Sequence, residues 1–190
     1  MKILRSDDHK QMPWKNGGGV TVEIAIHPAD ATVDNFDWRI STAKVAEDGA
    51  FSVFADIDRT LAVLDGNGIV LSVDGVETKL TQASEPYSFA GDAPTSACLI
   101  DGKITDLNMM TRRGVYAHTV TRIVLDGSPV HLQIKGQSLL FVASGLVRIQ
   151  NAQHEEKLFA RDCARFDVEE TSNLQITGEA VAYLISFKSI

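Results

Sequence analysis

The most informative stretch of the sequence is Met12-Pro13-Trp14-Lys15-Asn16-Gly17-Gly18-Gly19, followed by the alternating segment Val20-Thr21-Val22-Glu23-Ile24. Three consecutive glycines are costly, because glycine loses more backbone entropy on folding than any other residue. Such a run is typical of a sharp turn or of a place where another group approaches the backbone closely. The alternation that follows has the period of two that is typical of a β-strand. Composition alone leaves two interpretations open: a glycine-rich turn and a ligand-contacting loop.

Period-two alternation continues along most of the chain, and the helical period is scarce. Turn dipeptides such as Asp65-Gly66 and Asp74-Gly75 separate the alternating segments, as they do in β-hairpins. The segments with strand character are Val20–Ile26, Trp38–Ser41, Thr60–Leu64, Gly68–Val73, Pro86–Ala90, Ala97–Ile100, Leu107–Thr111, Thr119–Leu125, Ser138–Val142, Leu146–Gln150, Ala164–Phe166, Asn173–Thr177 and Val181–Phe187. Many short strands separated by turns indicate an all-β sandwich or barrel.

The two halves of the chain also resemble each other. Thr60-Leu61-Ala62-Val63-Leu64 has a counterpart in Ser138-Leu139-Leu140-Phe141-Val142, and the order of strands and turns that follows is similar in both halves. Chance pairing of strand residues is the alternative, because identity between the halves is low. We expect two similar β-barrels packed together, an N-terminal one over residues 1–113 and a C-terminal one over residues 114–190.

Composition narrows the class of protein. Of the 190 residues 44% are apolar, which is enough for a sizeable core without metals or disulfides. The net charge of -7 and the lack of Lys and Arg clusters argue against a nucleic-acid partner. No apolar run is long enough for a membrane span or a signal peptide, so no membrane partner is expected. Cys98 and Cys163 lack CxxC spacing and are interpreted as buried free thiols, which suits a cytoplasmic location.

Signatures of metal and nucleophilic catalysis are not found in the sequence. The five histidines form no HxH or HxxH pair, so we predict no bound metal and no other cofactor. No GxSxG nucleophile elbow occurs, and neither cysteine lies in a basic context near a histidine. The sequence therefore leaves enzymatic activity open and favours a protein that is not an enzyme.

Polar side chains at strand positions supply the candidates for a binding pocket. Arg59 shares a strand face with Leu61 and Val63, where a buried guanidinium needs a carboxylate or another anion as partner. Each charged candidate has the alternative of internal pairing or plain exposure. The residues that we expect to bind a small carboxylate are Trp14, Lys15, Asn16, Glu23, Arg39, Arg59 and Asn108, and the expected walls are Phe51, Phe54 and Met110. For the two phenylalanines, core packing is the alternative to a pocket wall.

These residues also carry a resemblance to a known family. Residues 12–24 resemble the N-terminal signature of the HutD/Ves family, as do Phe36-Asp37-Trp38-Arg39-Ile40-Ser41 and Asp48-Gly49-Ala50-Phe51-Ser52-Val53-Phe54-Ala55-Asp56-Ile57-Asp58-Arg59. Asp106-Leu107-Asn108-Met109-Met110-Thr111-Arg112 is similar to the next block of the family. The resemblance covers the N-terminal half, and the rest of the chain matches only in its strand pattern.

The resemblance implies a bicupin, in which two cupin-type β-barrels of the RmlC-like jelly-roll type pack together in one chain without the usual cupin metal ligands. HutD proteins are associated with histidine utilisation. The resemblance therefore implies a non-enzymatic regulator that limits histidine catabolism by binding a small carboxylate, such as N-formylglutamate or urocanate. By resemblance Arg59 is the carboxylate clamp, and Asn16, Arg39 and Asn108 are second choices. A homodimer is left open.

Two other function classes remain as alternatives. One is a metal-independent cupin enzyme, an isomerase or hydrolase, with Glu23 or Asp106 as its base. The other is a structural or assembly protein with no ligand. The chain departs from the family at Ala55-Asp56, where members often have proline-glycine, so the loop before Arg59 is expected to differ in shape. Ves relatives are tied to a cold-responsive stress role, so the resemblance alone does not decide the pathway.

Overall fold

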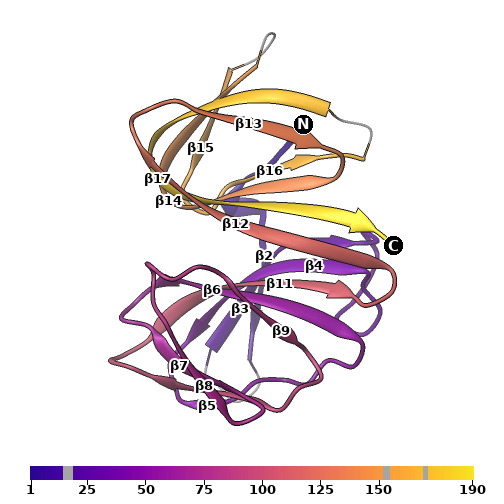
Figure 1. Cartoon of the computed structure of the whole chain (residues 1–190), viewed down its shortest axis with the longest axis vertical. Coiled ribbons are helices and arrows are strands. Elements are labelled where there is room, and N and C mark those ends of the chain that lie inside the picture. The colour runs from indigo at the N-terminus through magenta and orange to yellow at the C-terminus, as the bar shows by residue number, and fades with distance from the viewer. Residues whose placement is uncertain (15–18, 152–154, 169–170) are drawn as a thin grey trace. The chain divides into compact units, whose positions relative to one another are not determined.

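The computed structural model describes residues 1–14, 19–151, 155–168 and 171–190. Over these ranges the chain forms β-strands joined by turns, with a single 3-10 turn at Ser6–Asp8 and no α-helix (Figure 1). The prediction of an all-β protein is therefore confirmed. Within the same ranges no helix has the length and apolar character that crossing a membrane would require.

The chain divides into two compact units. The N-terminal unit comprises His9–Ala117 with Ser189–Ile190, and the C-terminal unit comprises Met1–Asp8 with His118–Lys188. The sequence predicts a boundary between the two barrels after residue 113, with the whole N-terminus in the first barrel. In the structure, β1 (Lys2–Leu4) instead pairs with β16 (Cys163–Phe166) of the C-terminal unit. A strand of three residues is too short for its alternation to indicate a partner.

The N-terminal unit consists of two antiparallel sheets (Figure 1). The larger sheet has the order β2-β3-β4-β11-β6-β9 and the smaller one the order β5-β10-β7-β8. Their strands are β2 (Lys10–Pro13), β3 (Gly19–His27), β4 (Trp38–Val45), β5 (Gly49–Ala50), β6 (Ile57–Asp65), β7 (Ile69–Val73), β8 (Val76–Leu80), β9 (Tyr87–Ala90), β10 (Thr95–Leu99) and β11 (Ile104–Arg112).

One apolar cluster joins the two sheets of the N-terminal unit. Leu61 and Val63 of β6 pack in it together with Ile69 and Leu71 of β7, and all four side chains are at most 2% exposed. The sheets therefore pack face to face, as the layers of a jelly roll do. Arg59 precedes Leu61 by two residues on β6, so its side chain enters the same interior, as the alternation predicted.

The C-terminal unit is built on a seven-stranded sheet with the order β1-β16-β14-β17-β12. Strand β13 pairs with β17, and β15 pairs with β14. The remaining strands are β12 (Tyr116–Asp126), β13 (Val130–Lys135), β14 (Ser138–Gln150), β15 (Glu155–Phe159) and β17 (Thr171–Ser189). Its core consists of apolar side chains such as Leu140, Val142, Phe166, Leu174 and Ile176, each at most 1% exposed.

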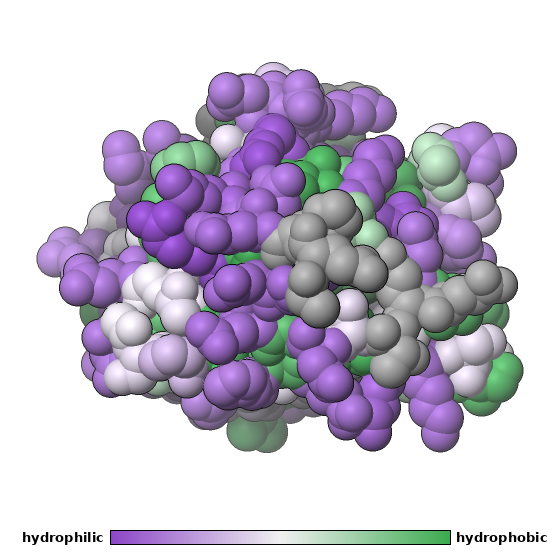
Figure 2. Space-filling model, turned by 90° about the horizontal axis from the view of Figure 1, so that it is seen from above, coloured by the Kyte–Doolittle hydropathy of each residue, from purple (hydrophilic) through white to green (hydrophobic). Residues whose placement is uncertain are grey.

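The outer surface is largely polar, and its larger apolar side chains are scattered. Figure 2 shows one face on which hydrophilic residues predominate and the hydrophobic patches are small and separate. Both cysteines are free thiols. Burial is confirmed for Cys163, but the prediction is wrong for Cys98, which is exposed. Cys98 alternates with the buried Ala97 on β10, so its side chain points away from the interior.

The described parts of the opening stretch lie on β2 and β3, which pair antiparallel. The backbone N–H of Trp14 donates to the carbonyl of Gly19 at 2.9 Å, and the indole Nε1 donates to Oγ1 of Thr21 at 2.8 Å. A Cβ on Gly19 would overlap the carbonyl of Lys44 and lie 2.9 Å from Cε3 of Trp14. Glycine is therefore needed at position 19 because the ring and a neighbouring strand approach its backbone closely. The rest of the glycine run lies outside the described residues.

Gly19→Ala is expected to destabilise the protein by about 1–3 kcal/mol, the usual cost of overpacking, because Trp14 or β4 must move. Gly49→Ala is the control, since no atom lies within 4 Å of a Cβ built there. The measurement is the free energy of unfolding in denaturant for both variants. Equal stabilities for the two variants would contradict the packing argument.

Candidate functional site

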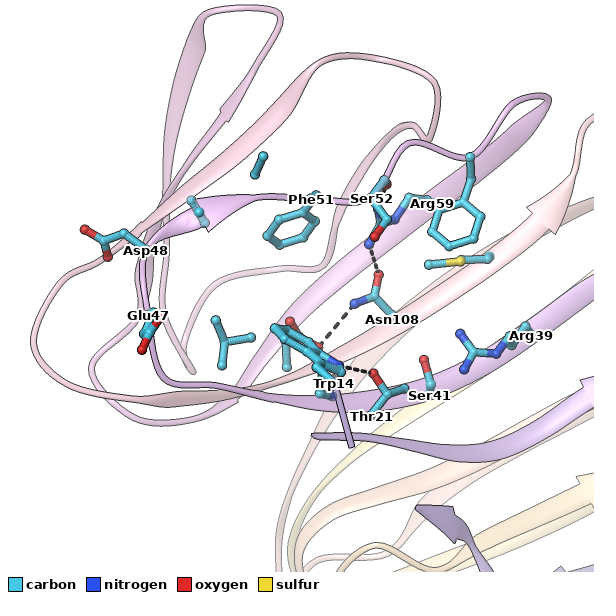
Figure 3. A pocket seen from close by; sticks show the side chains of 18 residues that line it. Trp14, Thr21, Arg39, Ser41, Glu47, Asp48, Phe51, Ser52, Arg59 and Asn108 are labelled. Carbon is cyan, nitrogen blue, oxygen red and sulfur yellow. Dashed lines mark hydrogen bonds between the residues drawn. The ribbon is translucent and has the colours of Figure 1, made fainter. Parts of the chain in front are cut away.

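A cavity of about 540 Å³ lies in the N-terminal unit (Figure 3). This volume is in the range of sites for small metabolites. Its lining includes Ala97 and Gly49 from the smaller sheet and residues of β3, β4, β6 and β11 from the larger sheet. The predicted residues that line it are Trp14, Arg39, Phe51, Phe54, Arg59, Asn108 and Met110.

The register of three neighbouring strands arranges the polar floor of the cavity. Met110 on β11 pairs with Arg39 on β4 and with Arg59 on β6, so the two arginines flank it in one row. Neighbouring strands are about 4.8 Å apart, which puts the two arginine backbones roughly 10 Å apart. Two residues back along β11, Asn108 pairs with Ser41 of β4. Alternation then brings these rows to the same face of the sheet.

Arg59 is a buried cation that donates hydrogen bonds to two residues. It is 4% exposed. Its Nη2 donates to Oδ1 of Asn108 at 2.7 Å, and its Nη1 donates to the carbonyl of Ser52 at 3.2 Å (Figure 3). Its Nε has no hydrogen-bond partner among the described residues. The guanidinium is thus fixed in place with part of its donor capacity unused.

Three aromatic rings surround the Arg59 guanidinium. Its Cζ lies 5.1 Å from the centre of the Phe51 ring, 5.7 Å from that of Phe54 and 5.2 Å from that of Phe89. Cation–π attraction to these faces offsets part of the cost of burying the charge. Burial, together with Arg39, lowers the pKa of Arg59 to about 10, while Asp106 opposes the shift. Arg59 therefore remains charged at neutral pH.

Asp106 is a buried carboxyl group on the floor of the cavity, with 1% of its surface exposed. Its Oδ1 accepts from the backbone N–H of Ala43 at 3.2 Å and from Nδ2 of Asn108 at 3.2 Å. Burial raises the pKa of Asp106 to about 7, although Arg59 and these two hydrogen bonds act to lower it. Asp106 therefore changes its charge near neutral pH.

Arg39 is the second buried arginine of the cavity, and it is paired with Glu23. Its Nε donates to Oε2 of Glu23 at 2.7 Å, and both side chains are largely buried. Its two terminal nitrogens have no hydrogen-bond partner among the described residues. Glu23 is not in contact with the cavity, so its place in this structure is that of an anchor for Arg39.

The turn before Arg59 holds a non-glycine residue in a left-handed backbone conformation. Asp56 has φ of +58°, the left-handed conformation that glycine adopts most easily. Its carbonyl accepts from the backbone N–H of Arg113 at 2.8 Å. An aspartate thus occupies a position at which a glycine would be unstrained.

Some of the residues that line the cavity follow from strand alternation, and others do not. Trp14 lines the cavity, whereas the predicted residues Lys15 and Asn16 lie outside the described residues. Asp106 lines the cavity on the same strand face as Asn108 and Met110, as its spacing from them on the strand indicates. The lining residues that sequence reasoning did not select are Thr21, Ser41, Ala43, Val45, Glu47, Asp48, Gly49, Ala50, Ser52 and Ala97. Glu47, Asp48 and Ser52 lie between strands, where periodicity supplies no signal, and the others lie on strands.

The polar groups of the cavity are two guanidiniums, an amide, hydroxyl groups and carboxyl groups. Over the described ranges, no group of three His, Cys, Asp or Glu side chains is placed to hold a metal ion. The positively charged arginines on the floor do not suit a metal ion, which is itself positively charged. They suit an anion that accepts hydrogen bonds.

The chain has a cupin-type fold, and its N-terminal unit holds the arginine-lined cavity. A cupin 2 conserved barrel domain protein from Leptotrichia buccalis has the same fold, with a TM-score of 0.60 at 12% identity over 94% of this chain and 96% of that one. The family model for HutD matches residues 6–184. The chain therefore belongs to the HutD family, and the prediction of a bicupin in this family is confirmed.

Individual relatives agree with this assignment. The structure of HutD from Pseudomonas fluorescens is similar, with a TM-score of 0.86 at 31% identity over 100% of this chain and 98% of that one. An uncharacterized 21.2 kDa protein of Pseudomonas putida in the hutC 3' region is 35% identical over 94% of this chain and 93% of its own length. Protein Ves of Cronobacter sakazakii is 39% identical over 56% of this chain and 59% of its own length. Family membership supports a role related to histidine utilisation.

The raised pKa of Asp106 predicts how stability varies with pH. Unfolded Asp106 ionises near pH 3.9, so between about pH 4 and pH 7 the folded protein holds a proton that the unfolded chain has lost. This contribution makes the folded state less stable as the pH rises through that window, by at most about 4 kcal/mol.

The test compares the free energy of unfolding of the native protein and of Asp106→Asn from pH 4.5 to pH 8. The variant has no proton to lose, so its stability is expected to fall less over this window. Asp30→Asn replaces an exposed carboxylate and is expected to leave the native slope unchanged. Parallel curves for the native protein and Asp106→Asn would refute the assignment.

Proposed function

We propose that this protein binds a small carboxylate in the cavity of the N-terminal unit and limits histidine utilisation without converting its ligand. The observation that carries the proposal is the row of two buried arginines, Arg39 and Arg59, on the floor of a metabolite-sized cavity. Both are 4% exposed, and burying guanidinium groups is costly unless anions or hydrogen-bond acceptors compensate their charge.

The unused donors of the two arginines support a carboxylate as ligand. Arg39 keeps two terminal nitrogens without a partner among the described residues, while its Nε is held by Glu23. A planar guanidinium offers parallel N–H groups that match the two oxygens of a carboxylate. Trp14 and Phe51 add apolar walls for the rest of a small molecule.

The hydrogen bonds that polar side chains of the site make with one another support binding without turnover. Asn108 is bonded on both sides, to Arg59 and to Asp106, and Glu23 is bonded to Arg39. The family association with histidine utilisation, and the P. putida relative in the hutC 3' region, suggest intermediates of that pathway as ligands. N-Formylglutamate and urocanate are small carboxylates of this kind.

The test is calorimetric titration of the protein with N-formylglutamate, urocanate and histidine. Arg59→Ala is expected to weaken binding of the preferred carboxylate by at least tenfold, because a charge-assisted hydrogen bond contributes about 1.5–3 kcal/mol. Arg148→Ala removes an exposed arginine from the C-terminal unit and should bind as the native protein does. Unchanged affinity in a folded Arg59→Ala protein would rule out the clamp.

An enzymatic function is the second candidate, and one observation favours it. Asp106 lines the cavity, and burial raises its pKa to about 7, where a general base operates best. Glu23, the other base considered, does not line the cavity and is bonded to Arg39. The geometry therefore favours Asp106 over Glu23 in this role.

Turnover is tested by incubating purified, chelator-treated protein with each pathway intermediate and following its loss by chromatography. An isomerase or hydrolase that uses Asp106 as its base is expected to lose activity at least a hundredfold in Asp106→Asn, since general-base catalysis contributes about 10²–10⁴-fold. Asp30→Asn serves as the control. Activity that is equal in Asp106→Asn and the native protein would exclude Asp106 as the base.

A further inference from the structure

Asp106 has a carboxyl group on the floor of the cavity. The described residues form hydrogen bonds with only one of its two oxygens. Oδ1 accepts two N–H groups, from Ala43 and from Asn108. No described residue donates a hydrogen bond to Oδ2, although the side chain lines the cavity. Oδ2 is thus the oxygen that is left for a ligand.

The direction of the hydrogen bonds around Asn108 determines where a proton on Asp106 can lie. A guanidinium can only donate, so Asn108 must turn its Oδ1 toward Arg59. Its Nδ2 then points to Asp106 and donates to Oδ1. The backbone N–H of Ala43 is a donor as well. Oδ1 therefore faces two donors, and a proton on this carboxyl group can only be on Oδ2.

The charges that surround Asp106 come from neighbouring strands of the larger sheet. Arg59 is on β6 and Arg39 on β4, and Glu23 on β3 is paired with Arg39. Glu47 and Asp48 also line the cavity, but they are exposed, and Figure 3 shows them at the end away from Arg39 and Arg59. With Asp106 neutral, the two arginines and Glu23 leave one positive charge on the floor. With Asp106 ionised, that charge is cancelled.

We propose that Asp106 binds the ligand as a carboxylic acid, with Oδ2–H donating to a carboxylate oxygen of the ligand that the arginine pair attracts. This inference rests on the proposed function and adds a ligand-contacting residue to it. The ligand is then bound together with one proton, which is taken from solvent whenever Asp106 is ionised in the free protein. No covalent bond is made or broken.

This role has a consequence for affinity. The free protein loses the Asp106 proton near pH 7, because burial raises its pKa to about that value. Below that pH the affinity for a carboxylate is constant, and above it the affinity falls by up to tenfold per pH unit, since each unit lowers the protonated fraction tenfold. Between pH 6 and pH 9 the expected loss is about a hundredfold.

Asparagine is a suitable replacement because its amide has the shape of the protonated acid. In Asp106→Asn the oxygen can accept from Ala43 and Asn108, and the NH₂ group takes the place of Oδ2–H as donor to the ligand. The variant is expected to bind as tightly at pH 9 as at pH 6. Asp106→Ala lacks the donor and is expected to bind at least tenfold more weakly at pH 6.

The experiment is calorimetric titration with N-formylglutamate, whose carboxylates stay ionised from pH 6 to pH 9. It is carried out in two buffers of different ionisation enthalpy, so that proton uptake is measured directly. The native protein is expected to take up close to one proton at pH 8.5, and Asp106→Asn none. Asp30→Asn is the matched control and should behave as the native protein.

Two results would overturn the inference, and they differ in what they say about the proposed function. Binding by the native protein that is equally tight from pH 6 to pH 9, with no proton uptake, would refute the role of Asp106 and leave carboxylate binding intact. This measurement needs no variant, so it stands even if Asp106→Asn does not fold. No binding of N-formylglutamate by the native protein at any pH would refute both the inference and this ligand of the proposed function.

Discussion

The burial of the Arg59 guanidinium between two sheets is the constraint on which the cavity depends. A cation in this place is stable only if acceptors and aromatic faces replace the water that it loses. Asn108, the carbonyl of Ser52 and three phenylalanine rings do so. Asn108 in turn donates a hydrogen bond to Asp106. Arg59 thus also binds the carbonyl of Ser52, in the segment that leads into β6.

The two units of the chain differ in the side chains that line their interiors. The C-terminal unit fills its interior with apolar side chains such as Leu140 and Phe166. The N-terminal unit has an apolar cluster around Leu61 as well, but the row that contains Arg39, Met110 and Arg59 keeps polar groups beside a cavity. An interior filled with apolar side chains supports the fold, whereas an interior with unused donors is suited to a ligand.

The parts of the site that could be predicted are those that strand alternation controls. Arg59, Asn108 and Met110 could be placed on inward faces because every second residue of a strand shares a side. The partner of Arg39 could not be predicted, because a residue on β4 meets Glu23 on β3 only through a register that includes a bulge between Glu23 and Ala25. The same limit applies to β1, whose three residues do not indicate that they pair with β16.

The all-β class, the HutD family and several inward-facing residues could be predicted from the sequence, because they follow from alternation, turn dipeptides and motif. Which inward-facing residues are in contact is seen only in the folded structure. It joined Arg59, Asn108 and Asp106 into one hydrogen-bonded chain and left Oδ2 of Asp106 without a donor among the described residues. The physical reason is that hydrogen bonding and desolvation depend on distances across strands, and those distances are set when the sheets form and pack.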